Sequence, residues 1–507
     1  MAQTTAAAPR SARHALRPSI ALWLLLALAF LARLAPVLRG GGLRGILAYD
    51  DGVYFGAADA LLSGRLPYRD FLLLHPPGVL IALAPFAALG RLTSDPLGLA
   101  VARLAFMAIG ALNAVLVYAV ARRVGRVAGV AAGLMYAMWG PAVYAERTTL
   151  LEPLVNLGVL AALLVLGDVR VASRRRLLFA GAVLGAATAV KLWAVVPLVV
   201  LTVWVVRRRG RSAGATFVSA SALAASAVCL PFFLTAPGPM LRMVVLDQLG
   251  RPHNGVSTWL RLAGIFGHPG GGGRAAAVVL VATVLAVVLA LVAAAVVATA
   301  PELRVWPALL AGQGALLLIG PAYYDHYATF VAPALCLVVG SAIGIVVARF
   351  EVRWWRPVPV VAVSCLALAA LSVVGPVHRE GRRPPSARAA KLVGALRCVR
   401  ADSSAALIET NSLTRDLRHG CPLALDVTGV TYDVDSSQLH DGRPSVGRRA
   451  DPAWQRFVGS YVTGADAFIV VQAGADGFGP GVRAVLKSQR VLLRVRHLTV
   501  YRTTGRR

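Results

Sequence analysis

The chain has 507 residues, of which 57% are hydrophobic and only 15% charged, and its mean hydropathy is +0.68. Soluble domains carry about 25% charged residues, so this composition excludes a soluble globular protein and predicts a polytopic α-helical membrane protein. The formal net charge of +29 does not indicate a nucleic-acid partner, because many arginines stand in short clusters between apolar runs, as in the cytoplasmic loops of membrane proteins.

The N-terminus has three arginines before its first apolar run, which resembles a signal peptide. The run at 20–35 lacks a convincing small-residue cleavage site and is long enough to span a bilayer. We therefore expect an uncleaved anchor preceded by a cytoplasmic tail at 1–18.

Apolar runs then recur along the chain to residue 375. They lie at 19–38, 77–92, 98–121, 127–145, 153–169, 177–192, 194–206, 213–234, 275–300, 305–320, 328–348 and 357–375. The run at 77–92 is marginal for a span, because a helix rises only 1.5 Å per residue. If 77–92 spanned, every later basic cluster would face outward. We therefore predict an interfacial or re-entrant helix there, about eleven spans, a cytoplasmic N-terminus and an external C-terminus.

This topology predicts a transmembrane catalytic domain at 19–375. Its external loops are 39–97, 146–152, 235–274 and 321–327. The acidic residues of the membrane half fall on or near that external face, although acids contribute little to the topology rule. Carboxylates gathered at one face indicate a site there.

The tail at 376–507 predicts a small extracytoplasmic α/β domain with a basic surface. Expected strands are 405–409, 422–427, 467–471 and 490–501, and expected helices are 387–400 and 481–489. The basic surface suits an anionic polymer or lipid headgroup, or is simply solvated. Cys398 and Cys421 could form a disulfide if the tail is exported.

Two adjacent carboxylates, Asp50 and Asp51, follow the first predicted span. Glycosyl transfer needs a base that deprotonates the acceptor hydroxyl, and a carboxylate suits that role. The alternative is a helix N-cap, because an Asp before an apolar stretch caps well.

Another polar element is His75, which precedes two prolines and the 77–92 run. His75 could bind a phosphate or a metal ion, or be held by a backbone carbonyl. Glu146 and Glu152 flank a helix break. They could orient the acceptor or hold a divalent cation such as Mg or Mn, while Arg147 could simply pair with Glu146.

A cation is needed to hold the leaving phosphate. The candidates are Lys191, Arg251, His253, Arg261 and His326. Lys191 is the only lysine of the membrane half, and its alternative role is snorkelling to the interface. The tyrosines at 323–327 are typical interfacial anchors, whereas Asp325 and His326 are candidate site residues.

These elements together resemble the GT-C superfamily, especially the protein O-mannosyltransferases and the lipid A aminoarabinose transferases. The resemblance covers about residues 20–210 and rests on Asp50-Asp51, on His75-Pro76-Pro77-Gly78 and on Glu146 with Glu152-Pro153. The tail looks like extensions of actinobacterial members.

The resemblance implies that Asp50 is the base, Asp51 a helper, and Glu146 or Glu152 a second acid. His75 stands where the aminoarabinose transferases carry a phosphate-binding lysine. The implied donor is a sugar on a polyprenyl phosphate, transferred with inversion, and metal dependence stays open.

We therefore expect an inverting hexosyl- or pentosyltransferase on the outer face of the plasma membrane. Its acceptor would be a cell-envelope glycan, a lipoglycan or a protein. The donor phosphate would be bound by His75, Arg147, Lys191, His253 and His326. One alternative is a transporter or flippase, which would place charges near the midplane and often shows inverted repeats. A noncatalytic scaffold is another.

Overall fold

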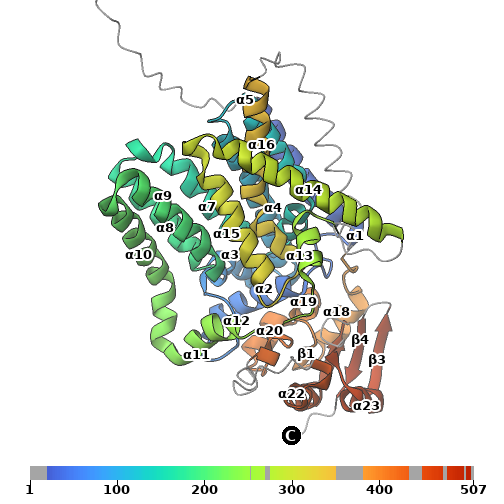
Figure 1. Ribbon diagram of the computed structural model, residues 1–507. Coiled ribbons are helices and arrows are strands. Elements are labelled where there is room, and N and C mark those ends of the chain that lie inside the picture. The colour runs from blue at the N-terminus through green and yellow to red at the C-terminus, as the bar shows by residue number, and fades with distance from the viewer. Residues whose placement is uncertain are drawn as a thin grey trace, which may run out of the picture.

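The apolar runs fold into a bundle of helices, and the C-terminal part of the chain packs at one end of that bundle (Figure 1). The computed structural model describes residues 20–251, 253–268, 274–349, 381–432, 448–471, 477–495 and 498–503. The apolar run at 357–375 lies outside these residues.

Six described helices are long and apolar enough to cross a membrane, or seven if one bent pair counts as a span. The bent pair is α5 (Arg126–Met138) and α6 (Gly140–Glu146), which meet at 56°. The candidate spans are α1 (Ile20–Gly40), α4 (Asp95–Ala121), α10 (Arg211–Thr235), most of α14 (Arg274–Ala298), the stretch Pro301–Ile319, which joins a 3-10 turn to α15 (Val305–Ile319), and α16 (Ala332–Arg349). Predicting a polytopic helical membrane protein was therefore right, while the count of eleven spans stays a prediction.

Shorter helices complete the bundle. They are α3 (Gly78–Leu92), α7 (Glu152–Leu166), α8 (Arg174–Thr188) and α9 (Val195–Arg209), and between α10 and α14 come α11 (Pro237–Leu241), a π-helical turn (Arg242–Leu246), α12 (Asp247–Leu249) and α13 (Thr258–Ile265). Helix α3 has 15 residues, which agrees with the short helix expected at 77–92. Its first amide, at Gly78, donates to the Ala189 carbonyl oxygen at 2.8 Å and so joins α3 to the end of α8.

Helix α2 (Tyr49–Leu62) was not expected from the sequence. Its residues from Asp51 to Ala60 are buried, so α2 shows no apolar stripe that a sequence pattern could reveal. The N-cap is Ala48, which makes no side-chain hydrogen bond. The N-cap alternative for the acidic pair is therefore wrong. Both acids lie in the first helical turn, where a negative charge faces the positive end of the helix dipole.

The C-terminal part contains a four-stranded sheet in the order β1-β2-β4-β3. Strand β1 (Val399–Ala401) runs parallel to β2 (Ala467–Val470), and β3 (Arg490–Val495) and β4 (Leu498–Arg502) are antiparallel. The helices are α18 (Ala387–Gly394), α19 (Ser404–Glu409), α20 (Leu413–Arg418), α22 (Pro452–Thr463) and α23 (Pro480–Ser488).

Several tail predictions need correction. Residues 405–409 form helix α19 rather than a strand, and 422–427 form no strand. A short apolar run does not distinguish a strand from a buried helix turn. The helix expected at 387–400 ends at Gly394, and 490–501 contains two strands, β3 and most of β4, instead of one. The strand at 467–471 and the helix at 481–489 agree with β2 and α23.

The tail docks on α2 and α4 through close backbone packing and buried polar contacts. Any side chain at Gly52 of α2 would overlap the backbone of Ala405 in α19. Arg103 of α4 forms ion pairs with Asp51 and, at 3.4 Å, with Glu409 of α19. Removing one partner of such a buried pair is strongly destabilising, so α19 is bound firmly to the membrane half.

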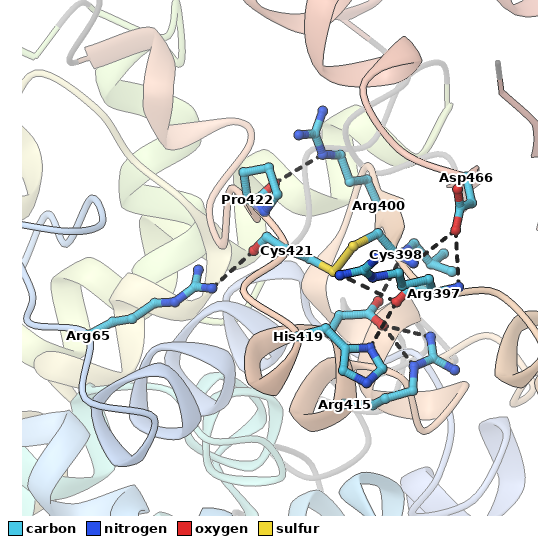
Figure 2. Close-up of a disulfide and its surroundings, with 11 residues drawn as sticks. Arg65, Arg397, Cys398, Arg400, Arg415, His419, Cys421, Pro422 and Asp466 are labelled. Atoms are coloured by element: carbon cyan, nitrogen blue, oxygen red, sulfur yellow. Dashed lines mark hydrogen bonds and ion pairs between the residues drawn. A yellow bond between two sulfur atoms is a disulfide. The ribbon is translucent and has the colours of Figure 1, made fainter. Parts of the chain in front are cut away.

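A disulfide joins Cys398, just before β1, to Cys421, just after α20, with 5.8 Å between the Cα atoms (Figure 2). Two arginines hold the chain that leaves this bond. Arg65 donates to the Cys421 carbonyl oxygen at 3.1 Å and Arg400 to that of Pro422 at 3.0 Å. The disulfide and these two contacts position the segment that leads to Asp426.

Candidate active site

A cavity of about 420 Å³ lies where the first turn of α2, the loop before α3, the turn before α7 and the C-terminal part meet. This volume suits a small-molecule site, because ligand pockets measure about 300–1,000 Å³. Its polar lining comprises Tyr49, Asp50, Tyr54, His75, Tyr144, Arg147, Thr148, Glu152, Lys191, Arg251, Tyr324, His326, Tyr327, Asp426, Thr428 and Arg448.

Asp50 reaches the cavity from the first turn of α2. Burial, and next the charge of Asp426, raise the pKa of the Asp50 carboxyl to about 7. The positive charges of Arg251 and Lys191 oppose this rise. A carboxylate with such a pKa is a stronger base than an exposed one and is poised for proton transfer near neutral pH.

Lys191 and Glu152 form a charged pair in the cavity lining. The Lys191 Nζ atom lies 2.5 Å from Glu152 Oε1, and His326 Nε2 lies 3.9 Å from the same oxygen. The ammonium group also lies 3.8 Å from the Trp193 ring centroid and 4.4 Å from that of Tyr327. Because Lys191 is buried and paired, the snorkelling alternative is wrong.

Arginines add further positive charge to the lining. Arg251 donates to the Tyr327 hydroxyl at 3.1 Å, and Arg147 stacks over the Tyr144 ring at 4.9 Å. Arginine side chains bind phosphate oxygens well, because the guanidinium group presents several donors in one plane.

The two cavity histidines are neutral at pH 7. Burial, followed by the charge of Lys191, holds the pKa of His75 well below its usual value. Burial also lowers the pKa of His326 to about 4. Both imidazoles can therefore donate a hydrogen bond to a phosphate without adding charge.

Several candidates named from the sequence do not line the cavity. Asp51 pairs with Arg103 and accepts from the Thr149 amide and hydroxyl at 3.0 and 2.7 Å. His253 is exposed. Arg261 donates to backbone carbonyl oxygens around residue 320, and Asp325 lies beside the cavity lining.

Glu146 is buried within the bundle. It pairs with Arg33 of α1 and accepts from the Tyr136 hydroxyl at 2.6 Å and the Asn113 amide at 3.1 Å. Its ion-pair partner is therefore Arg33, and the suggested pairing with Arg147 is wrong. Of the two glutamates Glu146 and Glu152, Glu152 is the one that lines the cavity.

The C-terminal part adds residues to the cavity that were not identified from the sequence, namely Asp426, Thr428, Gly429 and Arg448. Asp426 was expected at the end of a strand. The one local signal is its place in Asp426-Val427-Thr428-Gly429, an acid followed by turn-forming residues.

The described residues offer few ligands for a metal ion in this cavity. Across the described ranges, no group of three or more His, Cys, Asp or Glu side chains is placed to hold a metal ion. Of the cavity carboxylates, Glu152 is already occupied by Lys191. Dependence on Mg or Mn therefore remains a prediction, which a chelator assay decides.

Comparison with known proteins identifies related sequences and folds. Residues 73–321 match the model of glycosyltransferase family 87. ArnT from Cupriavidus metallidurans, solved with bound undecaprenyl phosphate, superposes with a TM-score of 0.60 at 16% identity, covering 96% of this chain and 98% of ArnT. No curated protein sequence matches.

Two further solved structures share the fold. The arabinofuranosyltransferase AftD from Mycobacteria has a TM-score of 0.55 at 15% identity, covering 96% of this chain and 40% of AftD. The Archaeoglobus fulgidus oligosaccharyltransferase in its apo form has a TM-score of 0.55 at 10% identity, covering 89% and 70%. At these identities the likeness is one of fold.

Proposed function

We propose that this chain, a membrane glycosyltransferase with the GT-C fold, transfers a sugar from a polyprenyl-phosphate donor to a hydroxyl group of a cell-envelope acceptor. The observation that carries the proposal is the cavity itself. It combines Asp50, a half-buried carboxylate suited to act as a base, with the cations Lys191, Arg147 and Arg251. Such a pairing fits a reaction that removes a proton from one group and releases a phosphate from another.

The cations support a lipid-phosphate donor. The match to family 87 and the likeness to ArnT, which binds undecaprenyl phosphate, favour the same donor class. A polyprenyl chain stays in the bilayer, so its headgroup must be bound at the membrane surface. Loops and short helices that end at one face of the bundle suit that requirement (Figure 1).

In the proposed reaction, Asp50 takes the proton of the acceptor hydroxyl as that oxygen attacks the anomeric carbon. The bond from this carbon to the phosphate oxygen breaks, and the polyprenyl phosphate leaves with the electron pair. Lys191 and Arg251 stabilise the growing negative charge, while His75 and His326 donate hydrogen bonds. A single displacement of this kind inverts the anomeric configuration.

The proposal places the cavity on the outer face of the plasma membrane, with the N-terminus in the cytoplasm and residues 376–507 outside. The Cys398–Cys421 disulfide supports this orientation, because such bonds persist in oxidising compartments. The membrane domain at 19–375 would bind the donor, and a glycan, lipoglycan or protein would be the acceptor.

The test uses purified protein, polyprenyl-phosphate mannose, arabinose and glucose, and a cell-envelope extract. Asp50→Asn keeps the size of the side chain and removes the base, so transfer should fall about 10²–10⁴-fold. Asp168→Asn is the matched control, because Asp168 is exposed and only caps a short helical turn. Equal transfer by wild type and Asp50→Asn would refute the assignment of the base.

A further inference from the structure

Asp426 is a carboxylate of the cavity lining to which the proposed reaction gives no role. Its Oδ1 atom accepts from the Tyr49 hydroxyl at 3.1 Å, the Gly429 amide at 2.7 Å and the Thr428 hydroxyl at 3.1 Å. The Thr428 amide also donates to the Tyr49 hydroxyl oxygen at 3.0 Å. The carboxylate is thus fixed in place on the cavity wall by the start of α2 and by its own turn.

The backbone at Gly429 is part of this arrangement. A Cβ atom at Gly429 would collide with the Asp426 carboxylate. The turn therefore requires glycine for the carboxylate to keep its position. A precise position is what a ligand-binding side chain needs.

The charged groups of the cavity lining make different contacts. Lys191 lies against Glu152 and the aromatic rings, His326 lies near the same glutamate, and Arg251 is bonded to Tyr327. Asp426 is instead bonded to Tyr49, the residue before Asp50. A phosphate suits the cations Lys191 and Arg251, while a group rich in hydroxyls suits the Asp426 carboxylate.

Glycosyl transfer requires one base, and Asp50 already supplies it on the proposed mechanism. The hydrogen bonds that hold Asp426 all end on Oδ1, and a carboxylate has further lone pairs with which it can accept from a ligand in the cavity. A carbohydrate has neighbouring hydroxyl groups that can donate to both carboxylates at once.

We propose that Asp426, with Thr428 and Arg448, forms the acceptor subsite and binds hydroxyl groups of a carbohydrate acceptor next to the one that Asp50 deprotonates. This assignment rests on the proposed function for the identity of the reaction. It makes the acceptor a glycan or the glycan portion of a lipoglycan.

The test compares Asp426→Asn with wild type, using octyl disaccharides of mannose and of arabinose as acceptors and a threonine-rich peptide as the contrasting acceptor. We expect the KM for the accepted disaccharide to rise tenfold or more, because a hydrogen bond to a charged group is lost. The KM for the donor should stay within twofold, because the donor phosphate is assigned to Lys191 and Arg251. Asp451→Asn is the control, because Asp451 caps α22 in the same part of the chain and Asn caps equally well.

A second variant and a binding measurement separate the possible results. Gly429→Ala keeps the carboxylate but displaces it, so it should weaken disaccharide binding in calorimetric titration as Asp426→Asn does. An unchanged acceptor KM in Asp426→Asn, an equal rise in the KM for the donor, or transfer to the peptide alone would overturn the inference. If wild type uses no donor, the proposed function fails, and titration of wild type and Asp426→Asn with the disaccharides still decides the acceptor subsite.

Discussion

Raising the pH from 6 to 8 should activate the enzyme through Asp50. Its pKa is raised from 3.8 to about 7, so the basic form is present above pH 7 and is lost as the pH falls through 7. The cavity histidines do not titrate in this window, because the pKa of His75 lies well below its usual value and that of His326 is about 4. A polyprenyl-phosphate sugar is a phosphodiester and stays a monoanion throughout.

The magnitude follows from the fraction of Asp50 that is ionised. With a pKa of about 7, about one eleventh of Asp50 is ionised at pH 6 and about ten elevenths at pH 8, so kcat/KM should rise roughly tenfold. Asp426→Asn removes the second largest cause of the shift, after burial. In this variant the rise of kcat/KM with pH should therefore occur at lower pH than in wild type. It should still occur above the ordinary pKa range of an aspartate.

The assay is kcat/KM for the donor between pH 5 and 9 at saturating acceptor, for wild type, Asp426→Asn and the control Asp451→Asn. The wild-type profile should have unit slope below pH 7 and a plateau above it. A flat profile across this range would refute the role of Asp50 as the base. If kcat/KM rises at the same pH in Asp426→Asn as in wild type, the charges of Asp50 and Asp426 are not coupled.

Three further results are expected. Lys191→Met and Glu152→Gln should each lower the free energy of unfolding by about 3–5 kcal/mol, because each leaves a buried charge unpaired. Thermal unfolding in detergent should show that the double variant is more stable than either single variant, while its transfer activity stays low. Arg103→Gln should cost about 3–5 kcal/mol by unpairing buried carboxylates, and limited proteolysis should release the tail sooner; an unchanged cleavage rate would contradict the docking. Replacing Cys398 and Cys421 by serine should cost about 2–4 kcal/mol, and denaturant titration with and without reductant measures this directly.

The membrane half could be anticipated from the sequence because polar residues are conspicuous in an apolar chain. Asp50, His75, Glu152, Lys191 and His326 were all named from the sequence, and all line one cavity. Their chemistry and their position at the ends of apolar runs were enough to single them out.

The sequence could not reveal which of two neighbouring acids faces the cavity. Successive residues of a helix point about 100° apart, so Asp50 opens on the cavity while Asp51 turns toward Arg103. Glu146 likewise points into the bundle toward Arg33. Such directions depend on tertiary partners far away in the chain.

The contribution of the tail was hidden for the same reason. Asp426 reaches the cavity only because α19 packs on α2 and because the chain after Cys421 is held by Arg65 and Arg400. No local pattern records these contacts. The strand expected at 422–427 failed because apolar residues there pack against other elements without pairing in a sheet.

The hydrogen bond between Tyr49 and Asp426 joins residues that are 377 positions apart. At about 5–20 residues per second, a ribosome needs roughly 20 to 75 seconds to make the intervening chain. During that time the nascent protein already carries Asp50 and, later, Lys191 and Arg251, but it does not yet contain Asp426. The cavity lining is therefore complete only after the segment around Asp426 has been synthesised and has folded back onto α2.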